Sequence, residues 1–419
     1  MKLSEDLAWR GLIKDRTFAD DSWLDEPRTF YHGIDASADS LTIGNLAALM
    51  LARRLMDAGW KTVLLVGGAT SLIGDPGGKE EERELQPREE VLKNVGSIKS
   101  QINRLFGGQE FTLVDNYDWF SGVKYLDFLR KVGKHFSMTE LMQRDFVAAR
   151  MGGQGSGISY AEFSYSLIQG YDYLQLFQKH NVQLQIGGSD QWGNMLSGVV
   201  LIRKKAGKEA HALSMPLVVD KATGRKFGKT EAGAVWLDPN KTTKTQFSQF
   251  WVNASDEDVE DYLKTFTLLP KEEIEGVMNE HHSAPSQRAA QRKLAEEVTS
   301  LIHPDSQSGV VDVVTKYLTS QVSLAEASET ELREIRQEIG SVSVLPEDVS
   351  NFSIAGALVA SGLASSNTEA RRLMNDGAVY INGQSINREK FEVDDFKNGS
   401  FLLRRGKAYK DSVLVELHK

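Results

Sequence analysis

The chain has 419 residues, 41% of them hydrophobic, which is enough for two or three domains with buried cores. A net charge of -9 excludes a uniformly basic coat for nucleic acid, although the part from Ser350 onward is locally basic, and the absence of cysteine excludes disulfides and thiolate metal sites. The sequence has neither a membrane span of roughly 18 apolar residues nor an apolar signal segment, so we expect a cytoplasmic protein without a membrane partner.

The N-terminal part alternates apolar strands with amphipathic helices. An extended run starts at Thr29 and is expected to break at Gly33, and helical spacing resumes after Gly44. The continuous apolar run at 61–66 is typical of a buried parallel strand, and a helix up to residue 105 and a strand at 111–114 follow it. This order predicts a doubly wound, Rossmann-like α/β domain with a parallel sheet.

The next elements are a helix at 159–179, a strand at 182–186, a helix that starts near Trp192 and a last strand near 215–219. Helical patterns dominate from Thr245 onward. We therefore expect a Rossmann-like domain at 1–220, a connecting loop at 221–244, an α-helical domain at 245–321, a weakly packed acidic linker at 322–350 and a small α+β unit at 351–419.

Four turns with glycine follow predicted strands, at Gly33, Gly67, Gly187 and Gly224. In an open parallel sheet such turns meet at the carboxyl edge, where ligands bind. The four segments are therefore interpreted together as one candidate site.

The helix at 159–179 carries Tyr165, Gln169 and Asp172, whose spacing places them on one face. A polar stripe is often only the wet side of a helix. Because apolar residues flank this stripe on both sides, a pocket lining is the better interpretation. A phenol, an amide and a carboxylate together suit a ligand with an ammonium and a hydroxyl group.

The segment QIGGSDQWGN lets a ligand approach the backbone at Gly187 and Gly188, and Asp190 can accept hydrogen bonds from a ribose. The alternative is that Ser189 or Asp190 only caps the helix at Trp192.

The segment KFGKT places Lys226, Lys229 and Thr230 in a loop that can close on a triphosphate, although a lysine-rich loop is often only solvated surface. No GxxxxGK[ST] phosphate loop is present. The segment GDPGGK adds Asp75 for an ammonium, and the nearby Lys79 and Arg83 suit phosphate or RNA.

In this order and spacing, the segments YHGIDASADSL, VGGATSLIGDPGGK, EFSYSLIQGYD, LQIGGSDQWGN and KFGKT resemble bacterial tyrosyl-tRNA synthetases, which are class I aminoacyl-tRNA synthetases. The C-terminal part is similar to an S4-type RNA-binding module. In that module Arg371, Arg372, Arg404, Arg405 and Lys407 could meet RNA phosphates.

The resemblance implies a role for each motif residue. Tyr31 and Asp172 would bind the substrate phenol, whereas Asp75, Tyr165 and Gln169 would hold its ammonium. Gln191 would lie near the carboxylate and the α-phosphate. The implied ATP-binding residues are Gly33, Asp35, Gly44, Gly188, Asp190 and Lys229, and the implied catalytic residues are Thr42, Asn45, Lys79, Arg83, Lys226, Lys229 and Thr230.

The chain departs from the family at the class I signature His-x-Gly-His, which here is Thr42-Ile43-Gly44-Asn45. The tyrosine carboxylate is itself the nucleophile, so no general base is needed, and a hydroxyl and an amide can also donate to phosphate. The leading hypothesis is therefore ATP-dependent attachment of L-tyrosine to tRNA(Tyr) through tyrosyl-adenylate.

Two alternatives remain, an RNA-binding paralogue that has lost adenylation and an enzyme that uses another acceptor. The resemblance further implies a homodimer, and Tyr125, Leu126, Phe128 and Leu129 could supply its apolar surface or could equally be core. No tightly bound cofactor and no protein-bound metal are expected, since Mg²⁺ would arrive with ATP.

Overall fold

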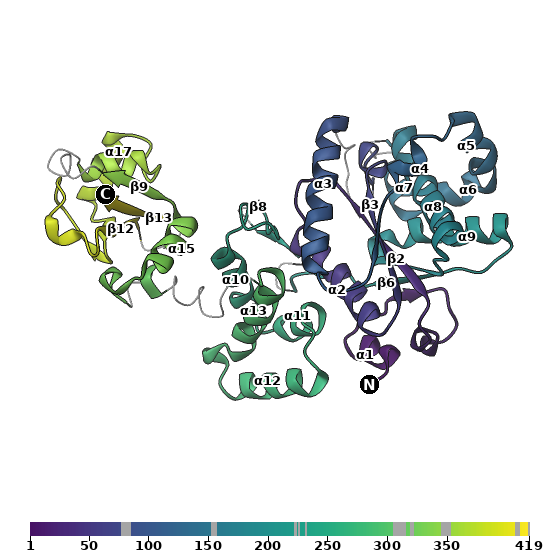
Figure 1. Cartoon of the computed structure of the whole chain (residues 1–419), viewed down its shortest axis with the longest axis horizontal. Coiled ribbons are helices and arrows are strands. Elements are labelled where there is room, and N and C mark those ends of the chain that lie inside the picture. The colour runs from purple at the N-terminus through teal and green to yellow at the C-terminus, as the bar shows by residue number, and fades with distance from the viewer. Residues whose placement is uncertain are drawn as a thin grey trace. The chain divides into compact units, whose positions relative to one another are not determined.

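The computed structural model covers the whole chain (Figure 1) and describes residues 1–76, 85–151, 157–221, 224, 227–230, 233–304, 316–318, 322–344, 353–406 and 411–417. The chain forms two compact units: residues 1–241 with 252–298, and residues 242–251 with 299–419. Each unit is described by itself. The boundaries expected for separate helical and S4-like domains stay a prediction.

The first unit is built on a six-stranded sheet in the order β1-β6-β5-β2-β3-β4, in which only β1 is antiparallel to its neighbour. The strands are β1 (Asp15–Arg16), β2 (Thr29–Asp35), β3 (Lys61–Gly67), β4 (Thr112–Asp115), β5 (Leu184–Gly188) and β6 (His211–Met215). Strand order and direction confirm the doubly wound parallel sheet.

Two strand boundaries were predicted wrongly. β2 does not break at Gly33, because pairing with β3 on one side and β5 on the other holds the strand up to Asp35. β6 lies at His211–Met215 instead of near 215–219, since Pro216 has no backbone N–H to donate within a sheet.

Helices cover both faces of this sheet. Side chains of successive strand residues point to opposite faces, and Tyr31, Val63 and Leu65 share a core cluster with residues of α8 (Tyr160–His180) and α9 (Trp192–Ala206). Figure 1 shows α3 (Arg88–Leu105) on one side of the strands and α8 and α9 on the other. The expected helix at 159–179 is confirmed as α8.

Two glycines allow α8 and α9 to pack closely. A Cβ atom at Gly198 would lie 2.5 Å from a ring carbon of Tyr173, and one at Gly170 would lie 3.2 Å from the backbone of Ser197. Tyr173 is fully buried. The close contact therefore fixes α8, the helix with the polar stripe, against α9.

We expect Gly198→Ala to lower the free energy of unfolding by about 1 to 3 kcal/mol, because the new methyl group meets the ring of Tyr173. Gly96→Ala is the matched control, since nothing lies within 4 Å of a Cβ atom at this position of α3. It should be neutral or stabilise by roughly 0.5 to 1 kcal/mol. Urea unfolding measures both, and equal effects would contradict the close packing.

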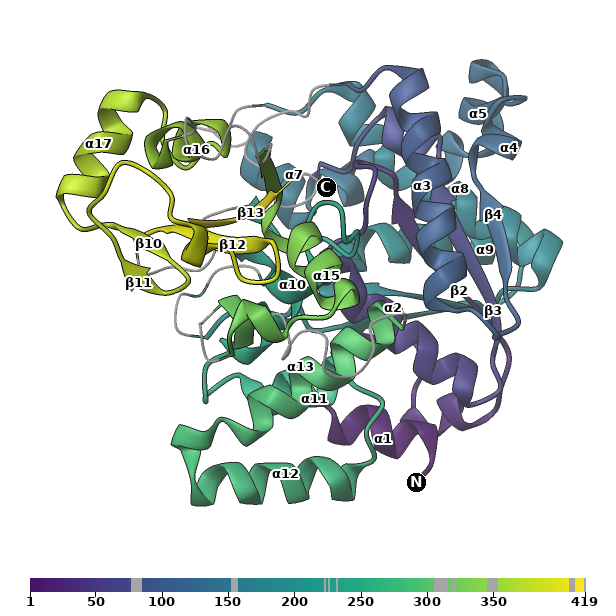
Figure 2. The same cartoon turned by 60° about the vertical axis from the view of Figure 1, so that its left-hand side comes forward.

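Two buried arginines, Arg10 directly after α1 (Leu3–Trp9) and Arg54 on α2 (Ile43–Asp57), bind the helical segment that follows the sheet. Arg54 donates to the carbonyl oxygens of Lys264 (2.9 Å) and Thr267 (2.5 Å), and Arg10 donates to those of Lys264 (3.0 Å) and Leu269 (2.6 Å). Figure 2 shows α1 (Leu3–Trp9) close to α11 (Val259–Phe266) and α12 (Lys271–Ser283). The C-terminal end of α11 is thus bound to α2.

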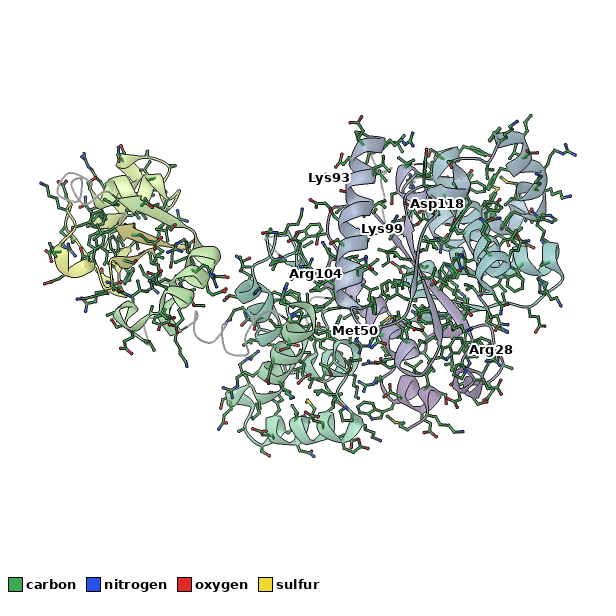
Figure 3. All side chains as sticks on the ribbon, viewed as in Figure 1. Arg28, Met50, Lys93, Lys99, Arg104 and Asp118 are labelled. Carbon is green, nitrogen blue, oxygen red and sulfur yellow. The ribbon has the colours of Figure 1, made fainter. Side chains whose placement is uncertain are left out.

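Further helices among the described residues are α4 (Tyr117–Phe120), α5 (Tyr125–Lys131), α6 (Met138–Met142), α7 (Asp145–Met151), α10 (Lys244–Val252) and α13 (Ala289–Ile302), and those near the C-terminus are given below. Figure 3 shows Lys93, Lys99 and Arg104 following one another along α3. Within the described residues, no helix combines the length and the apolar character needed to cross a membrane.

The second unit contains a five-stranded sheet in the order β11-β10-β12-β13-β9. Its elements are α15 (Glu329–Ile339), β9 (Ser341–Val344), α16 (Ile354–Ala360), α17 (Asn367–Asn375), β10 (Val379–Ile381), β11 (Gln384–Ser385), β12 (Ser400–Arg405) and β13 (Ser412–Leu417). The prediction of a weakly packed linker at 322–350 is wrong for its described part. α15 packs in a core with Leu402 and Leu414, and β9 pairs with β13.

Candidate active site

The sheet brings three of the four predicted turns together. Asp35 pairs with Gly67 at the ends of β2 and β3, and β5, on the other side of β2, runs through Gly187 to Gly188. Gly224 lies farther along the chain, in the loop beyond β6. The site is therefore centred on β3, β2 and β5.

Tyr31 and Asp172 lie close together in the interior, and Tyr31 is only 1% and Asp172 2% exposed. The Tyr31 hydroxyl has no hydrogen-bond partner. Burial raises the pKa of Tyr31 well above its usual range, and the nearby charge of Asp172 adds to the shift. A buried hydroxyl without a partner is costly, so this atom fits a polar group of a ligand.

The Asp172 carboxylate accepts hydrogen bonds from Asn116 Nδ2 at 3.0 Å and Trp119 Nε1 at 2.8 Å. Burial raises its pKa to about 8, which outweighs the opposite effect of these two donors, and the charges of Asp35 and Asp115 raise it further. The carboxyl group is therefore held in place from one side and retains acceptor capacity for a ligand.

This shift predicts a pH dependence. The pKa of the carboxyl group is 3.8 in the unfolded chain and about 8 in the folded one, so the folded state binds more protons between these values. The contribution of Asp172 to the free energy of unfolding therefore falls as pH rises from about 4 to about 8.

We expect Asp172→Asn to remove this fall, so that the variant gains stability relative to the parent chain between about pH 5 and about pH 8. Urea unfolding without ligand at several pH values measures it. The control Asp118→Asn removes an exposed carboxylate instead. Parallel pH profiles for the parent chain and Asp172→Asn would contradict the prediction.

A second group of polar side chains surrounds Tyr165. Its hydroxyl donates to Asp35 Oδ2 at 2.7 Å, and the Thr70 hydroxyl donates to Asp35 Oδ1 at 2.6 Å. Burial is the main cause of the raised pKa of Tyr165, and the charges of Asp35, Asp75 and Asp172 contribute. Three carboxylates near one buried phenol favour a cationic ligand group at this end of the pocket.

Two glutamines complete this end. The side-chain oxygen of Gln169 is buried without a partner, and Gln191 Nε2 donates to Asp75 Oδ2 at 2.6 Å. Tyr165, Gln169 and Asp172 thus lie on one side of α8, and Asp75 and Gln191 lie near Tyr165 from other segments. That they line a ligand pocket stays a prediction.

On the predicted nucleotide side, two glycines affect how closely a ligand can approach the backbone. Gly33 is exposed in the middle of a central strand, which lets a ligand approach the backbone. A Cβ atom at Gly188 would lie 2.7 Å from Asp190 Oδ1, so a side chain at this position would displace the Asp190 carboxylate. α9 begins with no capping hydrogen bond from the side chain of its N-cap residue Gln191, and the alternative that Ser189 or Asp190 caps the helix stays a prediction. Asp35, expected at the nucleotide, accepts hydrogen bonds from Tyr165 and Thr70, and its role toward ATP stays a prediction.

In the signature turn, Thr42 and Asn45 are hydrogen-bonded to each other. Thr42 precedes α2, and both its backbone N–H (3.0 Å) and its hydroxyl (2.9 Å) donate to Asn45 Oδ1. Because a backbone N–H can only donate, the accepting atom is the amide oxygen, and the Asn45 NH₂ group points elsewhere. The Thr42 hydroxyl, which was expected to donate to phosphate, donates to Asn45 in this structure.

The KFGKT segment lies against the same turn. A Cβ atom at Gly228, whose φ is +88°, would lie 2.9 Å from Ile43, and Ile43 N–H donates to the Val235 carbonyl at 3.1 Å. Between these contacts, β7 (Lys229–Thr230) pairs with β8 (Gly233–Ala234). Lys79, Arg83, Lys226 and Lys407 lie outside the described residues.

Sequence reasoning missed Thr70, Asn116 and Trp119, all of which bond pocket carboxylates. A signal was available for the last two, because they directly follow β4 at the same edge of the sheet. In the second unit, Arg371 and Arg372 are exposed on α17. Arg405 donates to the Leu363 carbonyl at 3.0 Å, whereas Arg404 lies over Tyr380, with 5.1 Å between its guanidinium and the ring centre.

Comparison with known proteins identifies the family. Residues 24–318 match the model for class I tRNA synthetases (W and Y). Residues 331–411 match the tyrosine–tRNA ligase SYY-like C-terminal domain.

The chain belongs to the class I tyrosyl-tRNA synthetase family.

Relatives in this family include the tyrosine–tRNA ligases of Streptococcus uberis, 42% identical, and Streptococcus pneumoniae, 40% identical; each comparison covers 97% of this chain and 98% of the relative. A solved tyrosyl-tRNA synthetase, the C-terminally truncated mitochondrial protein of Aspergillus nidulans, is 32% identical with a TM-score of 0.68 and covers 76% of this chain and 94% of that one. The resemblance of the motifs to this family is thus confirmed.

Proposed function

We propose that this chain activates L-tyrosine with ATP in the pocket described above and transfers the tyrosyl group to tRNA(Tyr). The observation that carries the proposal is the buried Tyr31 hydroxyl, which lacks a partner beside Asp172. A phenolic hydroxyl can donate to Asp172 and accept from Tyr31, which satisfies both groups. Phenylalanine would leave them unpaired.

The remaining roles follow from the same pocket. Asp75, Tyr165 and Gln169 hold the substrate ammonium, and the carboxylates around Tyr165 supply the opposite charge. Asn116, Trp119 and Thr70 act on the substrate only through Asp172 and Asp35, so they are positioning residues. On the nucleotide side, the Gly33 backbone and Asp190 bind the ATP ribose.

The chemistry is an in-line displacement. An oxygen of the tyrosine carboxylate attacks the α-phosphorus, a P–O bond to the β-phosphate breaks, and pyrophosphate leaves with its electron pair. Holding the two reactants supplies much of the rate. Donors from Lys79, Arg83, Lys226, Lys229 and Thr230 stabilise the growing charge on pyrophosphate. The tRNA then displaces AMP from tyrosyl-adenylate.

The pair Thr42 and Asn45 takes the place of the two signature histidines. The oxygen of Asn45 is fixed by two hydrogen bonds from Thr42, which orients its NH₂ group as a donor toward the nucleotide. A single lost transition-state donor costs about 3 to 4 kcal/mol, and a preorganised replacement costs less.

The test is tyrosine-dependent pyrophosphate exchange by the purified full-length chain. We expect exchange above background, and Tyr31→Phe should lower the preference for tyrosine over phenylalanine about 10-fold, because one neutral hydrogen bond is lost. No exchange at saturating ATP would contradict the proposal. It would favour the RNA-binding paralogue, a candidate supported only by the two absent histidines.

The double variant Thr42→His with Asn45→His restores both histidines. It further distinguishes the active synthetase from the RNA-binding paralogue. A large gain in exchange would mean that the parent site has decayed. No gain or a loss would mean that the site works with threonine and asparagine.

We further propose a homodimer, with cytoplasmic location and Mg²⁺ arriving on ATP. Among the described residues of the helices between β4 and β5, six large apolar side chains are exposed: Tyr125, Leu126, Met138, Met142, Met151 and Tyr160. Tyr125 and Tyr160 hydrogen-bond to each other. Such an exposed group favours a protein partner, and a second copy of the chain is the one implied by the family. Phe128 instead packs into the core with Tyr171.

Leu126 is 70% exposed, so Leu126→Glu should leave the fold intact and convert the dimer to a monomer. Sedimentation equilibrium measures the mass of both proteins. The control Val393→Glu changes another exposed apolar residue, in the second unit, and should remain dimeric. A monomeric parent chain, or an unaffected Leu126→Glu dimer, would contradict this surface.

A further inference from the structure

The segment that carries KFGKT is attached to α11 before the loop begins. Lys221 N–H donates to Asp258 Oδ1 at 3.3 Å, and its ammonium lies 2.7 Å from Asp261 Oδ2 and donates to the Glu257 carbonyl at 2.8 Å. Asp258 directly precedes α11 and is only 1% exposed. The start of the loop is therefore attached to the N-terminal end of this helix.

A second attachment lies within the motif itself. The ring of Phe227 packs on α11, with its centre 4.6 Å from that of Tyr262 and 5.3 Å from that of Phe266. Phe227 is 8% exposed and Phe266 fully buried. The Phe227 N–H also donates to the Val218 carbonyl at 3.1 Å, which joins the two arms of the loop at its neck.

The helix that receives Phe227 is itself fixed. The Tyr262 hydroxyl bonds Asp258, and burial together with the charges of Asp258 and Asp220 raises the pKa of Tyr262. At the other end, Arg54 of α2 binds the carbonyl oxygens of Lys264 and Thr267. Because α2 also begins with the Thr42–Asn45 turn, α2 and α11 form one frame for both phosphate-facing segments.

Lys229 follows Phe227 by two residues, and only Gly228 lies between them. The backbone of Gly228 lies against Ile43 and Gly44, and its carbonyl accepts from Val235 N–H at 3.2 Å. The hairpin of β7 and β8 extends beyond these contacts. The position of Lys229 and Thr230 is therefore set by how Phe227 and Gly228 are held.

We propose that Phe227 is a positioning residue for adenylation: by packing on Tyr262 and Phe266 it anchors the KFGKT loop to α11, at a fixed distance from the signature turn. The inference rests on the proposed function for its catalytic consequence only. The physical reason is that a loop held at its neck and at one buried ring samples fewer positions than a loop held at its ends.

The alternative is that Phe227 is only a core residue whose loss destabilises the unit. Both interpretations expect Phe227→Ala to be less stable, since a buried ring is removed. They differ in three further measurements: the loop's susceptibility to protease, the split between kcat and KM, and rescue by Phe227→Leu.

The experiment compares the full-length parent chain with Phe227→Ala, Phe227→Leu and the control Phe111→Ala. Phe111 is a partly buried ring in the same unit that packs on Phe106 instead of on α11. For Phe227→Ala we expect kcat of pyrophosphate exchange to fall roughly 10-fold to 100-fold with the KM for tyrosine unchanged, because misplacement of a catalytic group by about 1 Å has an effect of this size. Phe227→Leu should recover most of the loss.

Tryptic cleavage within residues 221–230, followed by mass spectrometry at a temperature where all four proteins are folded, reports on the loop without activity. We expect faster cleavage there in Phe227→Ala alone. Equal cleavage in Phe227→Ala and Phe111→Ala, or an equal loss of kcat in both, would overturn the proposal. A parent chain without exchange would remove the proposed function, and the cleavage result would still decide whether Phe227 anchors the loop.

Discussion

The pocket depends on one constraint, a carboxylate that is kept out of water at Asp172. Taking such a charge from water is costly, and the raised pKa records that cost. Asn116 and Trp119 offset part of it from one side, and the side next to Tyr31 is left for a ligand. The polar groups that the pocket leaves without a partner therefore determine which substrate binds. A substrate must supply a hydroxyl group at that point. The close packing of α8 on α9 and the alternation of side chains along β2 hold Asp172 and Tyr31 next to each other.

A second constraint joins the amino-acid side to the nucleotide side. β2 carries Tyr31 on the face toward α8, and its exposed Gly33 opens the backbone a few ångströms farther along the same strand. The chain then turns and enters α2 at Thr42. Under the proposed function, one strand and one helix thus contribute to both halves of the reaction, and α11 adds the loop segment. The proposed catalytic groups come from many segments, but few rigid elements position them.

The sequence predicted the parts of this site that follow from local periodicity. The stripe on α8 follows from helical spacing, and the meeting of the turns follows from the rule that parallel strands end at one edge. Asn116 and Trp119 were not predicted, because their segment lacks a clear hydrophobic period and only their place after β4 marks them. Strand β9 was not predicted for a different reason. Its partner β13 lies far along the chain, and a short, weakly apolar segment does not indicate such pairing. The boundary of β6 could have been read from Pro216.

The Thr42–Asn45 pair has a consequence for the enzyme's working conditions. An imidazole changes its charge near neutral pH, so a site that binds phosphate through histidines changes its affinity for phosphate when the pH falls. A hydroxyl and an amide carry no titratable proton in that range. In this chain the Thr42–Asn45 pair keeps the same charge in mildly acidic and neutral medium, so under the proposed function its contact with the nucleotide does not depend on pH in that range.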